Sequence, residues 1–120
     1  MKLADLDFHV QDGILVARLE GEIDLSNVGE IRSALLREMR SDILGLVVDL
    51  TEVGYLDSTG VQVIFEVREH LKPRGHEMRL VVPEGSTISK ILELVGAFSL
   101  VGIVTTVDSA LAELSGEAVA

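Results

Sequence analysis

The sequence predicts one α/β domain built on a mixed sheet of about four to five strands, with about four helices, mostly on one face. Apolar runs typical of strands alternate with segments of helical periodicity, and this order implies crossover connections and parallel strand pairs. Residues 8–10 and 14–19 flank Gln11-Asp12-Gly13, a β-hairpin signal that adds an antiparallel pair. No helix precedes the first strand, so one face of the sheet is expected to carry most of the helices.

The first half of the chain is expected to continue from this hairpin into a helix and a central strand. Gly21 is predicted to end the second strand, and Asp24, Ser26 or Asn27 can each cap the helix that follows. The near-continuous apolar run at residues 44–50 predicts a central strand that is covered or paired on both sides. The apolar positions of the helix recur at helical spacing: Val28, Ile31, Leu35 and Met39.

The second half is expected to contain two more strands and three more helices. Proline and glycine mark several of their ends, because proline cannot continue a helix and glycine suits the residue after one. The predicted elements are a helix over residues 58–72 stopped by Pro73, a strand over 78–82, a helix over 86–95 followed by Gly96, a strand over 103–105, and a last helix that starts at Asp108.

Length and composition predict one compact domain over residues 1–120, with a short flexible tail at residues 115–120. Hydrophobic residues make up 48% of the 120-residue chain, which is enough for a packed core. No segment offers the roughly 18 consecutive apolar residues that a membrane helix needs, and the N-terminus does not resemble a secretory signal. With no cysteine, neither disulfides nor thiolate chemistry is expected, and the cytoplasm is the predicted location.

The net charge of −10 argues against direct nucleic-acid binding, which requires clustered lysine and arginine side chains. A partner with a basic surface would be attracted to this chain instead, although acidity also serves solubility. The three histidines, His9, His70 and His76, lie in separate segments without the spacing of metal ligands. No nucleophile–base pair or phosphate-binding glycine-rich loop is present, so we expect no enzymatic activity, metal or cofactor.

The most informative segment is Asp57-Ser58-Thr59-Gly60, which follows the central strand and opens a helix. Asp57, Ser58 or Thr59 could each serve as the helix N-cap. Ser58 could instead accept a phosphate, which would carry about −1.5 to −2 charges near the positive end of the helix dipole. The fold would then survive phosphorylation while its surface changed, although Asp57 would oppose the added charge.

A longer pattern around this segment resembles the signature of STAS domains, and most resembles stand-alone bacterial anti-sigma factor antagonists. It runs from LVVDL at residues 46–50 through YLDSTG at residues 55–60 to VQVI at residues 61–64. Upstream, LEGEID at residues 19–24 is similar to that family's segment after its second strand. The resemblance spans essentially the whole chain and implies a single STAS domain.

The resemblance implies that Ser58 is phosphorylated by an anti-sigma factor that is also a serine kinase and carries ATP and Mg²⁺. It further implies that the unphosphorylated chain binds this kinase and thereby frees a sigma factor, and that a phosphoserine phosphatase restores the active form. The partner is expected to contact Asp24, Asp57, Thr59 and Gly60, with Gly60 allowing close approach. Thr59 remains a fallback phosphate acceptor.

The helix after Ser58 has a broad apolar arc, and Val63 and Val67 lie on one side of it. Core packing is one interpretation of these two valines. The other is an exposed docking strip beside Ser58, which predicts that Val63→Asp weakens partner binding without unfolding the domain.

A second function remains open from the sequence. The same STAS resemblance is compatible with an interaction or scaffold subunit of a transporter or of a stress-signalling complex, without phosphorylation of Ser58.

Overall fold

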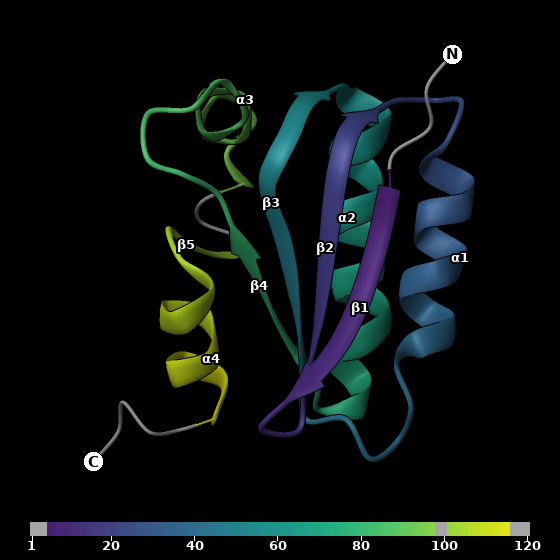
Figure 1. Ribbon diagram of the computed structural model, residues 1–120. Helices are drawn as coiled ribbons and strands as arrows, with labels where there is room; N and C mark the ends of the chain where they lie inside the picture. The colour runs from purple at the N-terminus through teal and green to yellow at the C-terminus, as the bar shows by residue number, and fades with distance from the viewer. Residues whose placement is uncertain (1–4, 98–100, 116–120) are drawn as a thin grey trace.

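The computed structural model describes residues 5–97 and 101–115, and these residues form a five-stranded mixed sheet with four α-helices (Figure 1). The strands follow one another across the sheet in chain order, and β1 is antiparallel to β2 while the remaining neighbours are parallel. The strands are β1 (Asp5–Gln11), β2 (Ile14–Ile23), β3 (Gly45–Leu56), β4 (Glu77–Val81) and β5 (Gly102–Val104). The helices are α1 (Val28–Glu38), α2 (Ser58–Leu71), α3 (Thr87–Leu94) and α4 (Val107–Ser115).

The predicted hairpin and most of the predicted elements are confirmed, with shifts of a few residues at their ends. Asp12 and Gly13 have φ angles of 55° and 78°, and a two-residue hairpin loop of type I′ requires positive φ at both positions. The helix predicted over residues 58–72 ends at Leu71 and continues as one 3₁₀ turn, Lys72–Arg74, in which Pro73 can be accommodated.

The sheet has one large and one small hydrophobic cluster, one on each face. Alternate residues of β2, such as Leu15, Ala17 and Leu19, belong to the large cluster together with the buried sides of α1, α2 and α3. Right-handed crossovers in a sheet that grows in one direction place their helices on the same face, which explains this arrangement. Helix α4 follows the last strand and packs against the opposite face through Ala110 and Leu111. The prediction that helices lie mostly on one face is therefore confirmed.

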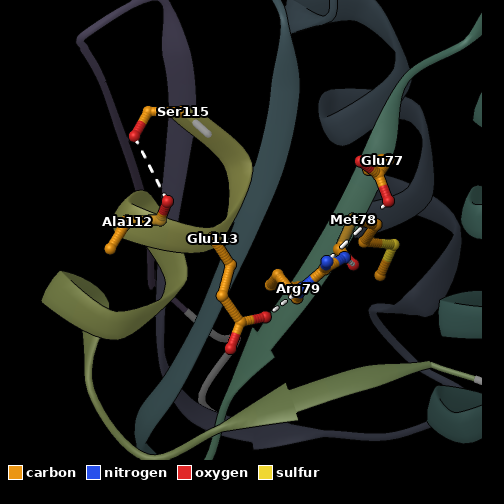
Figure 2. Close-up of polar contacts among 6 residues, drawn as sticks. All are labelled: Glu77, Met78, Arg79, Ala112, Glu113 and Ser115. Atoms are coloured by element: carbon orange, nitrogen blue, oxygen red, sulfur yellow. Dashed lines mark hydrogen bonds and ion pairs between the residues drawn. The ribbon is translucent and has the colours of Figure 1, made fainter. Parts of the chain in front are cut away.

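An ion pair between β4 and α4 helps to hold α4 against this second face. Figure 2 shows Arg79 of β4 reaching Glu113 of α4, and its Nε lies 2.7 Å from Glu113 Oε1. Ser115 is the last residue of α4, and its hydroxyl donates to the carbonyl of Ala112 at 3.3 Å. The tail predicted from residue 115 therefore cannot begin before residue 116, and residues 116–120 lie outside the described part of the chain.

Two strand predictions were too short, and their correction defines one end of the molecule. Gly21 does not end β2: it adopts a φ of 110°, and the strand continues past a shift in pairing register to Ile23. Likewise β3 does not stop at residue 50 but runs to Leu56, because residues 52–56 still pair with β2. Both strands consequently end side by side, where Ile23 pairs with Leu56.

The idea of an exposed apolar strip on α2 is wrong. Val63 is 9% exposed and Val67 is fully buried, and both belong to the large cluster beneath the sheet. The apolar arc of this helix is broad because α2 packs against α1 as well as against the strands. Val63 therefore cannot act as a direct docking residue, and the expectation for Val63→Asp reverses.

Val63→Asp is expected to unfold the domain rather than to weaken binding selectively. It places an unpaired carboxylate in the core, which should lower the free energy of unfolding by more than about 3 kcal/mol. Gln62→Asp is the matched control, since it puts the same side chain at an exposed neighbouring position and should change stability by less than about 0.5 kcal/mol. Urea unfolding followed by circular dichroism measures both, and equal stability of the two variants would contradict the buried position.

Candidate phosphorylation and docking site

The two segments that carry the predicted site meet at the common end of β2 and β3. The backbone N–H of Asp57 donates to the carbonyl of Ile23 across a distance of 3.3 Å. Figure 1 shows the loop that leads from β2 to α1 beside the start of α2, at the upper end of the sheet. The Asp24 segment and Ser58 thus share one surface, as the resemblance to STAS domains implied.

Asp57 is the N-cap of α2, and this decides among the three capping candidates. One oxygen of its carboxylate, Oδ1, accepts a hydrogen bond from the backbone N–H of Gly60 at 3.1 Å. The same oxygen accepts a hydrogen bond from the hydroxyl of Thr59. Asp57 therefore satisfies one of the free N–H groups at the helix start, and Ser58 is not needed for capping.

These hydrogen bonds keep Asp57 ionised. The Thr59 hydroxyl makes the largest contribution to lowering the pKa of Asp57 below its ordinary value, since it donates to the charged carboxylate. The backbone amides of Gly60, Thr59 and Leu25 lower the pKa further, and partial burial opposes them. Because Leu25 lies in the loop after β2, the carboxylate interacts with both segments of the site.

Ser58 is exposed as the first residue of α2, and its hydroxyl has no hydrogen-bond partner within the described residues. No acidic side chain lies in the first turn of α2, so the positive end of the helix is offset by the Asp57 cap alone. Thr59 is half-buried and its hydroxyl is engaged with Asp57. Of the two candidate acceptors, Ser58 is therefore the more accessible.

Asp24 does not cap α1 with its side chain, and neither does Asn27, the residue before the helix. The Asp24 carboxylate instead accepts from the backbone N–H of Ser26 at 2.9 Å and from its hydroxyl. Asn27 is 3% exposed, accepts from the Asp24 N–H at 3.1 Å and donates to the Glu22 carbonyl at 2.7 Å. These polar groups close the loop on itself rather than serve the helix end.

Gly60 is buried, which corrects the expectation that it allows a partner to approach. A Cβ atom at this position would overlap Leu56 Cδ1 and would lie 3.0 Å from Ile23 Cγ2. Any larger residue would therefore force the side chains of Leu56 and Ile23 to shift where the first turn of α2 packs on the ends of β2 and β3. Its contribution to the site is indirect, because it sets the distance between the helix start and the strand ends.

Sequence reasoning missed Leu25, which is 75% exposed between Asp24 and Ser26. The available signal was an apolar residue inside a polar loop, three residues before Val28, where the helical periodicity begins. No group of side chains able to hold a metal ion occurs among residues 5–97 and 101–115. Within the same residues, none of the helices is long and apolar enough to cross a bilayer.

Gly60→Ala is expected to destabilise the protein by about 1–3 kcal/mol, because the added methyl group overpacks against Leu56 and Ile23. Gly29→Ala is the matched control in the first turn of α1, where no atom lies within 4 Å of the added Cβ. It should be neutral or slightly stabilising, since alanine favours helix. Thermal unfolding compares the two, and equal melting temperatures would contradict the close packing at Gly60.

Asp57→Asn is expected to reduce the loss of stability in acid. A carboxylate whose pKa is lowered in the folded state stabilises the fold above its unfolded pKa, and that stabilisation is lost as the pH falls below about 4. Asparagine retains the cap but does not titrate. Urea unfolding between pH 7 and pH 3 should therefore show that the free energy of unfolding falls less in the variant than in the wild type. An equal fall in both proteins would disprove the stabilisation of the Asp57 carboxylate.

Comparison with curated proteins finds relatives of two kinds. The anti-sigma-F factor antagonist RsfB of Mycobacterium tuberculosis is 26% identical, and the match covers 88% of this chain and 84% of RsfB. The probable sulfate transporter 3.4 of Arabidopsis thaliana is 27% identical over 86% of this chain. The chain spans only 18% of the length of that transporter.

Solved structures share the fold. An anti-sigma factor antagonist from Mycobacterium paratuberculosis superposes with a TM-score of 0.84 at 23% identity, covering 93% of this chain and 94% of the other. The family model for the STAS domain matches residues 5–110, which include all five strands and both segments of the site. The chain therefore belongs to the STAS domain family.

Proposed function

We propose that this chain is an anti-sigma factor antagonist that is switched by phosphorylation of Ser58. In the unphosphorylated form it binds an anti-sigma factor that is also a serine kinase carrying ATP and Mg²⁺, and so frees a sigma factor. Phosphorylation of Ser58 releases the partner, and a phosphoserine phosphatase restores binding. The exposed Ser58 hydroxyl at the start of α2, left free because Asp57 caps the helix, is the observation that carries this proposal.

The position of Ser58 allows a phosphate without loss of the fold. An exposed side chain can take on the added volume without repacking, and the positive end of the α2 dipole favours negative charge. The cap does not depend on the Ser58 hydroxyl, so the helix start is preserved after modification. Repulsion from the neighbouring Asp57 carboxylate opposes the phosphate, but the high dielectric constant of water weakens it at this exposed surface.

The same position explains why binding would be lost. A phosphate adds about −1.5 to −2 charges at the centre of the surface that the partner must cover. Removing that charge from water costs several kcal/mol unless the partner provides matched cations in its place. The switch therefore acts on the interface, whereas the core beneath α2 is unaffected.

The relatives support a binding role for this family rather than catalysis. RsfB, whose name describes an antagonist of the anti-sigma-F factor, matches this chain over most of both lengths. We infer a non-enzymatic, cytoplasmic protein from this similarity and from the arrangement of the site. Asp57 then holds the two segments of the partner surface together, Asp24 orders the loop after β2, and Thr59 supports the Asp57 cap, whereas Val63 has no direct part in this surface.

A second candidate function is favoured by the similarity to sulfate transporters. In that case the chain would be an interaction unit of a larger transport or scaffold assembly, and Ser58 would remain unmodified. The two candidates make opposite predictions for the chemistry of Ser58.

Incubation of the purified chain with Mg-ATP and each kinase-type anti-sigma factor of its source organism is expected to add one phosphate, with a mass increase of about 80 Da. Ser58→Ala should abolish this modification. Ser41→Ala is the matched control, because Ser41 is another exposed serine that lies outside both segments of the site, and this variant should still acquire the phosphate on Ser58. Mass spectrometry of intact protein and of peptides locates the phosphate.

Failure of every such kinase to modify the wild-type chain, together with stable association with a transporter, would favour the second candidate. Phosphate on a residue other than Ser58 would contradict the assignment of the acceptor.

A further inference from the structure

Leu25 stands out because a large apolar side chain is 75% exposed beside the proposed phosphorylation site. The neighbouring positions 24 and 26 carry Asp and Ser, and both have polar partners inside the loop. Exposure of a leucine contributes nothing to folding, since burial is the source of apolar stabilisation. A leucine held in water at this position is therefore available for a contact between proteins.

The loop that carries Leu25 is held in one conformation. Hydrogen bonds within the loop join Asp24 to Ser26 and to Asn27, and the Asp24 carbonyl accepts from the N–H groups of Asn27 and Val28 at 3.1 and 3.0 Å. The buried amide of Asn27 ties the loop back to the Glu22 carbonyl at the end of β2. Leu25 is thus presented by a rigid turn, which reduces the entropy that ordering would cost on binding.

The Leu25 loop is also linked to the start of α2. The Asp57 N–H donates to the Ile23 carbonyl, and the Leu25 amide helps to stabilise the Asp57 carboxylate. The loop that carries Leu25 and the helix start that carries Ser58 are therefore both held at Asp57. A partner that covers Ser58 would meet Leu25 in the same surface.

Two further features indicate what kind of partner fits. A groove of about 710 Å³ extends from Leu25 along α1, and Gly29, Ser33 and Leu6 are among the residues that line it. Of the acidic side chains near this end, Glu20 and Glu52 lie near Arg18 and Glu66 pairs with Arg32. Around Leu25 and Ser58 themselves, the acidic residues Glu22, Asp24, Glu30 and Asp57 outnumber Arg37, which also lines the groove. This end of the molecule therefore offers an exposed apolar side chain next to a groove, on a surface whose net charge is negative.

We propose that Leu25 is the apolar anchor of the partner surface, and that the kinase partner receives it in an apolar pocket bordered by lysine or arginine side chains. This inference rests on the proposed function and adds the residue that gives the interface its affinity. Interface energy concentrates in a few desolvated anchors, while surrounding charges steer association and choose the partner. Partner side chains next to the pocket would lie in the groove along α1.

The test uses the full chain and the kinase that phosphorylates it, loaded with Mg-ADP so that no phosphate is transferred. Isothermal titration calorimetry should show that Leu25→Ser weakens binding by about ten- to a hundredfold. Leu44→Ser is the matched control, because Leu44 is another exposed leucine, 61% exposed, at the opposite end of β3. The affinity of this variant for the kinase should stay within about twofold of the wild-type value. Melting temperatures of both variants should equal that of wild type within a few degrees.

Wild-type affinity for Leu25→Ser, in a preparation where the wild-type chain binds, would overturn the anchor while leaving the proposed function intact. Absence of binding by the wild-type chain would count against the proposed function itself. A second measurement needs no partner: the Leu25 amide should have an NMR order parameter near 0.85, as in rigid backbone, and a value below about 0.6 would overturn the preorganised loop.

Discussion

The pairing of Ile23 with Leu56 is the constraint on which the functional end of this molecule depends. It brings the ends of two parallel strands to the same level, so that the loop after β2 and the start of α2 become neighbours. Gly60 makes the approach of the helix to both strand ends sterically possible. Asp57 then joins the two segments. Its backbone N–H donates to the Ile23 carbonyl, and its carboxylate interacts with the amides of Gly60 at the helix start and of Leu25 in the loop.

This arrangement separates the parts of the site that maintain the fold from the part that can change. Asp57, Thr59 and Gly60 are occupied by capping and packing, and Asp24 and Asn27 by the hydrogen bonds of the loop. Ser58 and Leu25, by contrast, project into solvent. A phosphate on Ser58 would change the charge of this surface, while the engaged residues keep its shape. This combination suits a reversible switch between binding and release.

Local patterns in the sequence were sufficient for the order of the elements, and the resemblance to STAS domains indicated that Asp24 and Ser58 share one surface. They were not sufficient where tertiary contacts decide. Gly21 suggested a strand end, but a positive φ at a register shift lets β2 continue. Val63 was ambiguous because periodicity does not reveal how many neighbours a helix packs against, and α2 contacts α1 as well as the sheet. Leu25 was missed because exposure within a polar loop is a property of the folded surface.

The central claim is that one phosphate on Ser58 controls association at this surface without disturbing the domain. Its most direct test compares the dissociation constants of the unmodified and the fully Ser58-phosphorylated chain for the same Mg-ADP-loaded kinase, together with their melting temperatures. We predict that phosphorylation weakens binding by at least about tenfold, while the two melting temperatures agree within a few degrees. Equal affinities of the two forms, or weaker binding accompanied by unfolding of the phosphorylated chain, would contradict the account.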